Sequence, residues 1–192
     1  MLCPVEPGRA EMKHETFSEQ PEFRAENLLL RAPRRSDAGL IGHYAGDPRV
    51  ARFTRSIPHP LPPGAAEAFV ARALAADRSE DVWVIDGAGG GLGEVLGVVA
   101  LDRLGRARSE IGYWVAPALW NGGIASQAVE ALLAANPHNC RSIVAEVFQD
   151  NPASARVLTR AGFDYLGDAD TFCVARGAMV PVWTYLRRLG PG

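Results

Sequence analysis

Long hydrophobic runs are missing from this sequence. No stretch approaches the roughly 20 apolar residues that a helix needs to cross a bilayer, and the amino terminus lacks the apolar core of a signal peptide. An excess of charge is also missing, because 20 basic and 22 acidic residues leave a net charge of -2. We therefore expect a cytoplasmic protein that is drawn neither to membranes nor to nucleic acid by its overall charge.

Cysteine is equally scarce. Cys3, Cys140 and Cys173 are odd in number, widely spaced and part of no paired motif. This pattern is typical of reduced structural thiols and argues against a disulfide framework or a zinc site. We expect no bound metal.

The remaining composition is that of a globular protein. Its 192 residues, 47% of them hydrophobic, suffice for one domain with a substantial core. Residues 1–25 are polar and carry prolines without any periodicity, which predicts a flexible N-terminal arm. A single domain is expected over residues 26–189.

Hydrophobic periodicity predicts strands and helices through that domain. The expected order is one strand, two helices, three strands, a helix, a strand, a helix and two strands. Strands joined by hairpins pair antiparallel, whereas strands separated by a helix can run parallel. The prediction is an α/β (α+β) fold, a mixed sheet with helices on both faces. The glycine loop over residues 87–93 lacks the G-x-G-x-x-G spacing and opens a strand, so we interpret it as a hairpin loop.

The most informative segment is residues 110–133, EIGYWVAPALWNGGIASQAVEALL. Its first part alternates as a strand that ends before Pro117, and its last part has the apolar spacing of an amphipathic helix. Between them, Gly122 and Gly123 allow positive φ angles, and Ala125 has almost no side chain. Such a turn either merely bends the chain or points free backbone N–H groups at a phosphate.

A second motif follows a predicted strand over residues 142–148. Together with the first segment, NPASARVLTRAGF at residues 151–163 resembles the acetyl-CoA-binding core of the GNAT superfamily of N-acetyltransferases. More narrowly, EIGYWVAP followed by Trp, and N-x-x-S-x-R-V-L-x-x-x-G-F, resemble the branch of the ribosomal-protein N-terminal (alanine) acetyltransferases. The resemblance extends over about residues 26–188. It implies a mostly antiparallel central sheet with one parallel pair at the acetyl-CoA site.

The resemblance also implies which residues bind acetyl-CoA, the co-substrate. Trp120, Gly123 and Ala125 match the signature Q/R-x-x-G-x-G/A, with Trp120 in place of the usual Gln or Arg. Binding of the pyrophosphate is therefore expected to depend on backbone N–H groups and the helix N-terminus. Binding of pantetheine is expected to depend on the strand edge. Asn151 is also read as a helix N-cap, and the two roles are compatible. The implied residues are Trp114, Val115, Asn121, Gly122, Gly123, Ile124, Ala125, Ser126, Asn151 and Ser154.

Direct transfer of an acetyl group to an amine needs a group that accepts the amine's proton and one that protonates the departing thiolate. Glu110 matches an acidic residue of this branch and is the candidate base, directly or through water; the alternative is a solvated carboxylate. Many family members carry tyrosine where this chain has Leu158. Ser154 then remains as the candidate acid, or as a plain helix residue. Tyr113 and Trp183 are expected in the core.

No motif identifies the acceptor amine. The expected substrate loops are residues 49–64 and 168–178. His59 in the first loop either contacts the acceptor or is an ordinary loop residue. Three arginines of that loop either hold an acidic substrate or face solvent, namely Arg49, Arg52 and Arg55. The acceptor is expected to be a protein N-terminus or a small-molecule amine that attacks in a ternary complex. A catalytically degenerate acetyl-CoA sensor and a partner-binding domain remain as alternatives, and the exposed sheet edges permit a homodimer.

Overall fold

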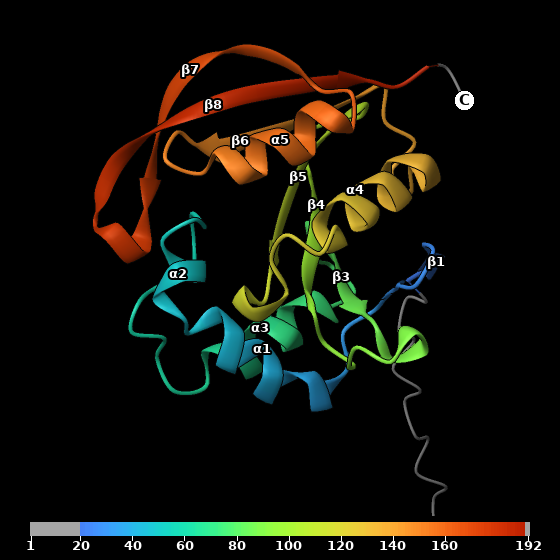
Figure 1. The fold of residues 1–192 in the computed structure, drawn as a ribbon, viewed down its shortest axis with the longest axis vertical. Helices are drawn as coiled ribbons and strands as arrows, with labels where there is room; N and C mark the ends of the chain where they lie inside the picture. The colour runs from blue at the N-terminus through green and yellow to red at the C-terminus, as the bar shows by residue number, and fades with distance from the viewer. Residues whose placement is uncertain (1–19, 191–192) are drawn as a thin grey trace, which may run out of the picture.

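An eight-stranded mixed sheet organises the chain (Figure 1). The computed structural model describes residues 20–190. The strands lie in the order β1-β2-β3-β4-β5-β6-β8-β7, and every neighbouring pair is antiparallel except β5 and β6, which are parallel. This confirms the predicted sheet. The strands are Phe23–Arg24 (β1), Leu29–Arg31 (β2), Glu80–Asp86 (β3), Gly97–Arg103 (β4), Arg108–Val115 (β5), Ser142–Phe148 (β6), Asp164–Cys173 (β7) and Ala178–Arg188 (β8).

Helices cover both faces of the sheet, as predicted. Their bounds are Ala38–Ala45 (α1), Pro48–Ala51 (α2), Ala65–Ala73 (α3), Ile124–Ala135 (α4) and Pro152–Arg160 (α5). Ile111 and Val115, on one face of β5, share a buried cluster with α4 and α5. Trp114 points to the other face, where it packs against the cluster under α1 and α3. The alternation along β5 therefore decides which helices lie on which side.

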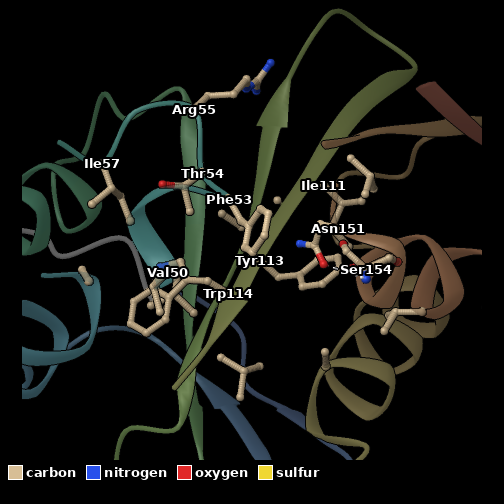
Figure 2. Close-up of a pocket in the computed structure, with 18 of the residues that line it drawn as sticks. Val50, Phe53, Thr54, Arg55, Ile57, Ile111, Tyr113, Trp114, Asn151 and Ser154 are labelled. Atoms are coloured by element: carbon tan, nitrogen blue, oxygen red, sulfur yellow. Dashed lines mark hydrogen bonds between the residues drawn. The ribbon is translucent and has the colours of Figure 1, made fainter. Parts of the chain in front are cut away.

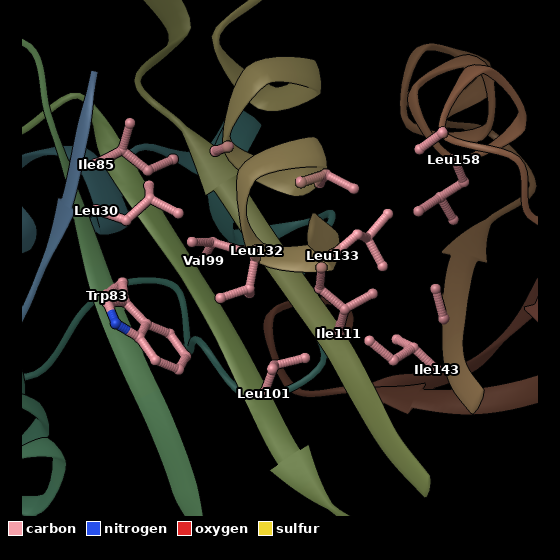
Figure 3. Packing of buried hydrophobic residues seen from close by; sticks show 14 of the residues in the cluster. Leu30, Trp83, Ile85, Val99, Leu101, Ile111, Leu132, Leu133, Ile143 and Leu158 are labelled. Carbon is pink, nitrogen blue, oxygen red and sulfur yellow. The ribbon is translucent and has the colours of Figure 1, made fainter. Parts of the chain in front are cut away.

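The larger cluster fixes α4 on the sheet (Figure 3). Leu132 of α4 is fully buried, and Leu133 is almost so, beside strand residues such as Val99 and Ile111. Burying each such side chain stabilises the fold by about 1.5–3 kcal/mol. Because α4 begins directly after the glycine turn, this packing also fixes the position of that turn.

Two elements were not predicted. β1 pairs with β2 at the end of the expected N-terminal arm, and the indole of Trp83 donates to the Pro21 carbonyl over 2.9 Å. The preceding part of that arm, residues 1–19, lies outside the described residues, as does Cys3. α2 is a short helix capped by the Asp47 side chain.

Residues 168–178 were expected to be a loop, but most of them belong to β7 and to the turn into β8. β7 continues to Cys173 and pairs with β8 along its length. A register shift between Tyr165 and Gly167 breaks the alternation from which the strand would be read.

Among residues 20–190, no helix is long and apolar enough to span a membrane.

Candidate active site

The parallel strands β5 and β6 separate soon after they begin. Their paired register covers Arg108, Ser109 and Glu110 of β5 and ends there. The later part of β5 instead borders a cavity of about 830 Å³. Residues of the turn before α4, the first turn of α5 and the loop after α2 also line this cavity. Backbone groups of β5 therefore face the cavity where a neighbouring strand would otherwise bind them.

The turn before α4 presents backbone N–H groups to this cavity. Asn121 and Gly123 have φ angles of 63° and 76°, and Gly123 is the N-cap of α4. The first N–H groups of an α-helix have no partner within the helix. A Cβ on Gly123 would meet only the Gln127 Nε2 atom, at 3.9 Å, so the space in front of the turn is open. This cradle fits a pyrophosphate group.

Trp120 connects the turn to the end of β5. Its indole Nε1 donates to the Val115 carbonyl over 2.8 Å, while its ring is 43% exposed and lines the cavity. The Trp114 carbonyl lies against Gly97 of β4, too close for any side chain at that position. The Trp114 carbonyl therefore points to β4, and the Val115 carbonyl points to the turn.

Ser154 lies opposite β5, in the first turn of α5. Its N–H donates to the Asn151 side chain over 3.3 Å, which caps the helix. Its hydroxyl is 2.8 Å from the Tyr113 hydroxyl, and the Tyr113 hydroxyl is also 3.2 Å from the Ser154 carbonyl (Figure 2). Burial raises the pKa of Tyr113 to about 12, although the bond to Ser154 opposes this. The phenol therefore keeps its proton at neutral pH.

Glu110 lies at the point where β5 and β6 begin to separate. Its side chain is 13% exposed and accepts an ion-paired contact of 2.7 Å from Arg55. Burial raises the pKa of Glu110 above its ordinary value, Glu146 and Asp102 add to this effect, and Arg55 opposes it. A carboxylate with a raised pKa is a better proton acceptor than an exposed one. Arg55 also contacts Glu146 over 3.4 Å.

Residues 27–164 match the model of the family described as Acetyltransferase (GNAT) domain. The chain belongs to this family. The resemblance found from the motifs alone is thereby confirmed.

Solved GNAT structures have the same fold. RimL, a ribosomal alpha-N-protein acetyltransferase in complex with coenzyme A, superposes with a TM-score of 0.77 at 20% identity, over 90% of this chain and 100% of that one. Spermidine N-acetyltransferase from Vibrio cholerae, with CoA and spermine, gives 0.73 at 19% identity over 86% and 97%. The microcin self-immunity acetyltransferase MccE, with acetyl-CoA and AMP, gives 0.73 at 16% identity over 85% and 93%. The TM-scores show that the fold is alike, and at these low identities the likeness is one of fold alone.

Most of the site residues implied by the GNAT resemblance line the single cavity described above. Gly122 lies within the turn but outside the lining, and His59 is also absent from it. The His59 ring contacts the Gly46 carbonyl over 3.2 Å, so nothing in the geometry supports contact with an acceptor. The lining includes Glu110, Trp114, Val115, Asn121, Gly123, Ile124, Ala125, Ser126, Asn151 and Ser154.

Several lining residues of this GNAT domain were missed or left open. Tyr113 was assigned to the core, yet its hydroxyl reaches Ser154. Glu80 and Glu146 line the cavity and were not singled out. The strand register carries the missing signal, because Glu80 and Glu110 both face Asp102 across neighbouring strands and therefore share its side of the sheet. That register becomes visible only in the folded chain.

The three arginines of the first substrate loop have different partners. Arg49 pairs with Asp47 over 2.7 Å, and Arg52 pairs with Asp150 over 3.0 Å. Arg55 alone of the three contacts Glu110. Within the described part of the chain, no group of three or more His, Cys, Asp and Glu side chains is arranged to hold a metal ion.

Proposed function

We propose that residues 26–189 form an N-acetyltransferase domain that transfers an acetyl group from acetyl-CoA to a primary amine. The acceptor is a protein N-terminus or a small-molecule amine, and it attacks directly in a ternary complex. The observation that carries this proposal is the convergence of the backbone cradle before α4, Glu110 and Ser154 on one cavity. The bound co-substrates of the GNAT structures RimL, MccE and spermidine N-acetyltransferase support the same assignment.

The cradle and the strand edge would hold the cofactor. Asn121, Gly123 and the first turn of α4 offer N–H groups and the positive end of the helix dipole to the pyrophosphate. The backbone of β5 near Val115 and the Asn151 amide are placed to bind pantetheine. Acetyl-CoA supplies the thioester whose carbonyl carbon is attacked. No metal is required for this reaction.

Glu110 and Ser154 would move the protons. An amine attacks only after it has lost a proton, and Glu110 accepts that proton directly or through a water molecule. The new bond joins the amine nitrogen to the acetyl carbon, and the carbon–sulfur bond breaks. Ser154 then donates its hydroxyl proton to the departing thiolate, and it regains a proton through water from the nitrogen, which loses its second proton as the amide forms. When Tyr113 donates to the Ser154 Oγ atom, the Ser154 proton is free to point into the cavity.

Two measurements test the proposal. Calorimetry with acetyl-CoA is expected to give binding with a single site, and CoA release is expected with at least one amine from a panel. The panel contains peptides that begin with Ala or Ser, polyamines and aminoglycosides. Binding without turnover of any amine would favour the acetyl-CoA sensor. If millimolar acetyl-CoA does not bind, both the enzyme and the sensor are excluded, and the partner-binding domain remains.

A further inference from the structure

Arg55 is held in place by its backbone, while its ion-paired side chain is half-exposed. Its carbonyl accepts from the Val174 N–H over 3.0 Å. The neighbouring carbonyls of Arg52 and Thr54 accept from Arg176 over 2.8 Å and from Cys173 over 3.3 Å. The turn between β7 and β8 therefore fixes the loop after α2. The Arg55 side chain is 47% exposed and can leave its ion pair by rotation about its own bonds.

The guanidinium of Arg55 contacts the carboxylates that a cationic acceptor would meet. It lies 2.7 Å from Glu110 and 3.4 Å from Glu146. A guanidinium stays charged at all working pH values, donates hydrogen bonds only and cannot give its proton to a base. It therefore blocks the lone pairs of Glu110 without itself being able to react.

We propose that the Arg55 guanidinium and the ammonium group of the acceptor compete for Glu110 and Glu146, so that Arg55 determines which amines bind. This inference rests on the proposed function and makes the acceptor a protonated primary amine. To bind, that amine must displace the Arg55 side chain toward solvent, and the half-exposed ion pair between Arg55 and Glu110 is then broken. The acceptor then meets Glu110 as the group that removes its proton.

The charges around Glu110 determine how removing Arg55 changes the pH dependence of kcat/KM. With Arg55 removed, the carboxylates on neighbouring strands dominate, and the pKa of Glu110 is expected to rise further. The base acts only when it is deprotonated, so the acidic limb of kcat/KM moves to higher pH. The groups that act on Glu110 or on its neighbour Glu80 are Arg55 from the loop after α2, Arg72 from α3, Asp102 from β4 and Glu146 from β6.

The test compares Arg55→Gln with Arg55→Lys and with a matched control. The control is Arg103→Gln, because Arg103 is 52% exposed, pairs with Asp81 over 3.0 Å and lies outside the cavity lining. Binding of spermidine is measured by calorimetry at mildly alkaline pH, well above the ordinary pKa of a glutamate. The protein is loaded with CoA, which carries no acetyl group to transfer. Removing a competing surface ion pair of about 0.4–1 kcal/mol should tighten binding by about two- to fivefold in Arg55→Gln.

Arg55→Lys should stay closer to the wild type, and Arg103→Gln should match it. Weaker or unchanged spermidine binding in Arg55→Gln would overturn the proposal and indicate that Arg55 instead attracts an acidic acceptor or faces solvent. No spermidine binding in either protein would overturn it as well. The calorimetric comparison needs no turnover. If the wild type releases no CoA with any amine, the proposed function is refuted, and the binding data still decide the role of Arg55.

Discussion

Removing one oxygen atom from Tyr113 tests whether Ser154 is held in place for proton transfer. The Tyr113 hydroxyl lies 2.8 Å from the Ser154 Oγ atom and 3.2 Å from the Ser154 carbonyl. In Tyr113→Phe the ring still fills its place beside α5, and only these contacts are lost. In the arrangement in which Tyr113 donates to the Ser154 Oγ atom, the serine hydroxyl then loses the donor that directs its own proton into the cavity.

The expected size of the effect follows from the kind of bond. A neutral hydrogen bond contributes about 1 kcal/mol, so kcat in Tyr113→Phe should fall about fivefold. Ser154→Ala removes the acid itself and should lower kcat by about a hundredfold. The KM for acetyl-CoA should change less than about twofold in both, because neither hydroxyl belongs to the phosphate cradle.

The decisive assay is a double-mutant cycle on CoA release. If Tyr113 acts through Ser154, Tyr113→Phe has almost no further effect once Ser154 is alanine. A full fivefold loss in the Ser154→Ala background would refute this reasoning and give Tyr113 a role of its own. Tyr185→Phe is the matched control, since Tyr185 is a second strand tyrosine, on β8, that does not line the cavity. A lost bond should also lower the Tm of Tyr113→Phe by about 2–4 °C.

Three further changes test the base, the cradle and a buried ion pair. Glu110→Gln should remove the acidic limb of kcat/KM. In the wild type this limb lies above the range of an ordinary glutamate, because burial raises the pKa of Glu110. An unaltered pH profile would rule Glu110 out as the base. Gly123→Ala should weaken acetyl-CoA binding about tenfold in calorimetry, because the added methyl strains a φ of 76° at the N-cap of α4, within the cradle. Gly177→Ala, with a φ of 61° outside the lining, carries similar strain and should leave binding unchanged. Asp37→Asn should cost about 3 kcal/mol of unfolding free energy in urea by disturbing the buried contact of 2.8 Å to Arg31; a loss under about 1 kcal/mol would contradict that estimate.

The features that could be predicted from the sequence are local ones. The turn before α4 follows from the two glycines and from the change of period from two to 3.6 residues, all within a few positions. The capping of α5 by Asn151 follows in the same way from its place before Pro152. The family resemblance added the parallel pair, and its two motifs lie on either side of β6.

Long-range pairs could not be predicted in this way. Arg55 and Glu110 are far apart in the sequence, and their contact depends on a loop that the β7–β8 turn holds by its backbone. Tyr113 was assigned to the core because its place in the alternation of β5 puts its ring on the buried face. The alternation gives the direction of a side chain but not what its terminal hydroxyl reaches, here the first turn of a helix that follows much later.

The partner of a side-chain polar atom, which the sequence pattern does not give, also explains how the motif accommodates Trp120. The resemblance marks this position as the departure from Gln or Arg and implies the loss of a polar side-chain contact. In the folded chain the indole N–H supplies a donor after all, and it donates to the Val115 carbonyl at the end of β5. The bond joins the last residue of the strand edge to the start of the cradle. Trp120 therefore positions the backbone that we propose to bind the cofactor, and in this proposal phosphate binding is left to the N–H groups of Asn121, Gly123 and the first turn of α4.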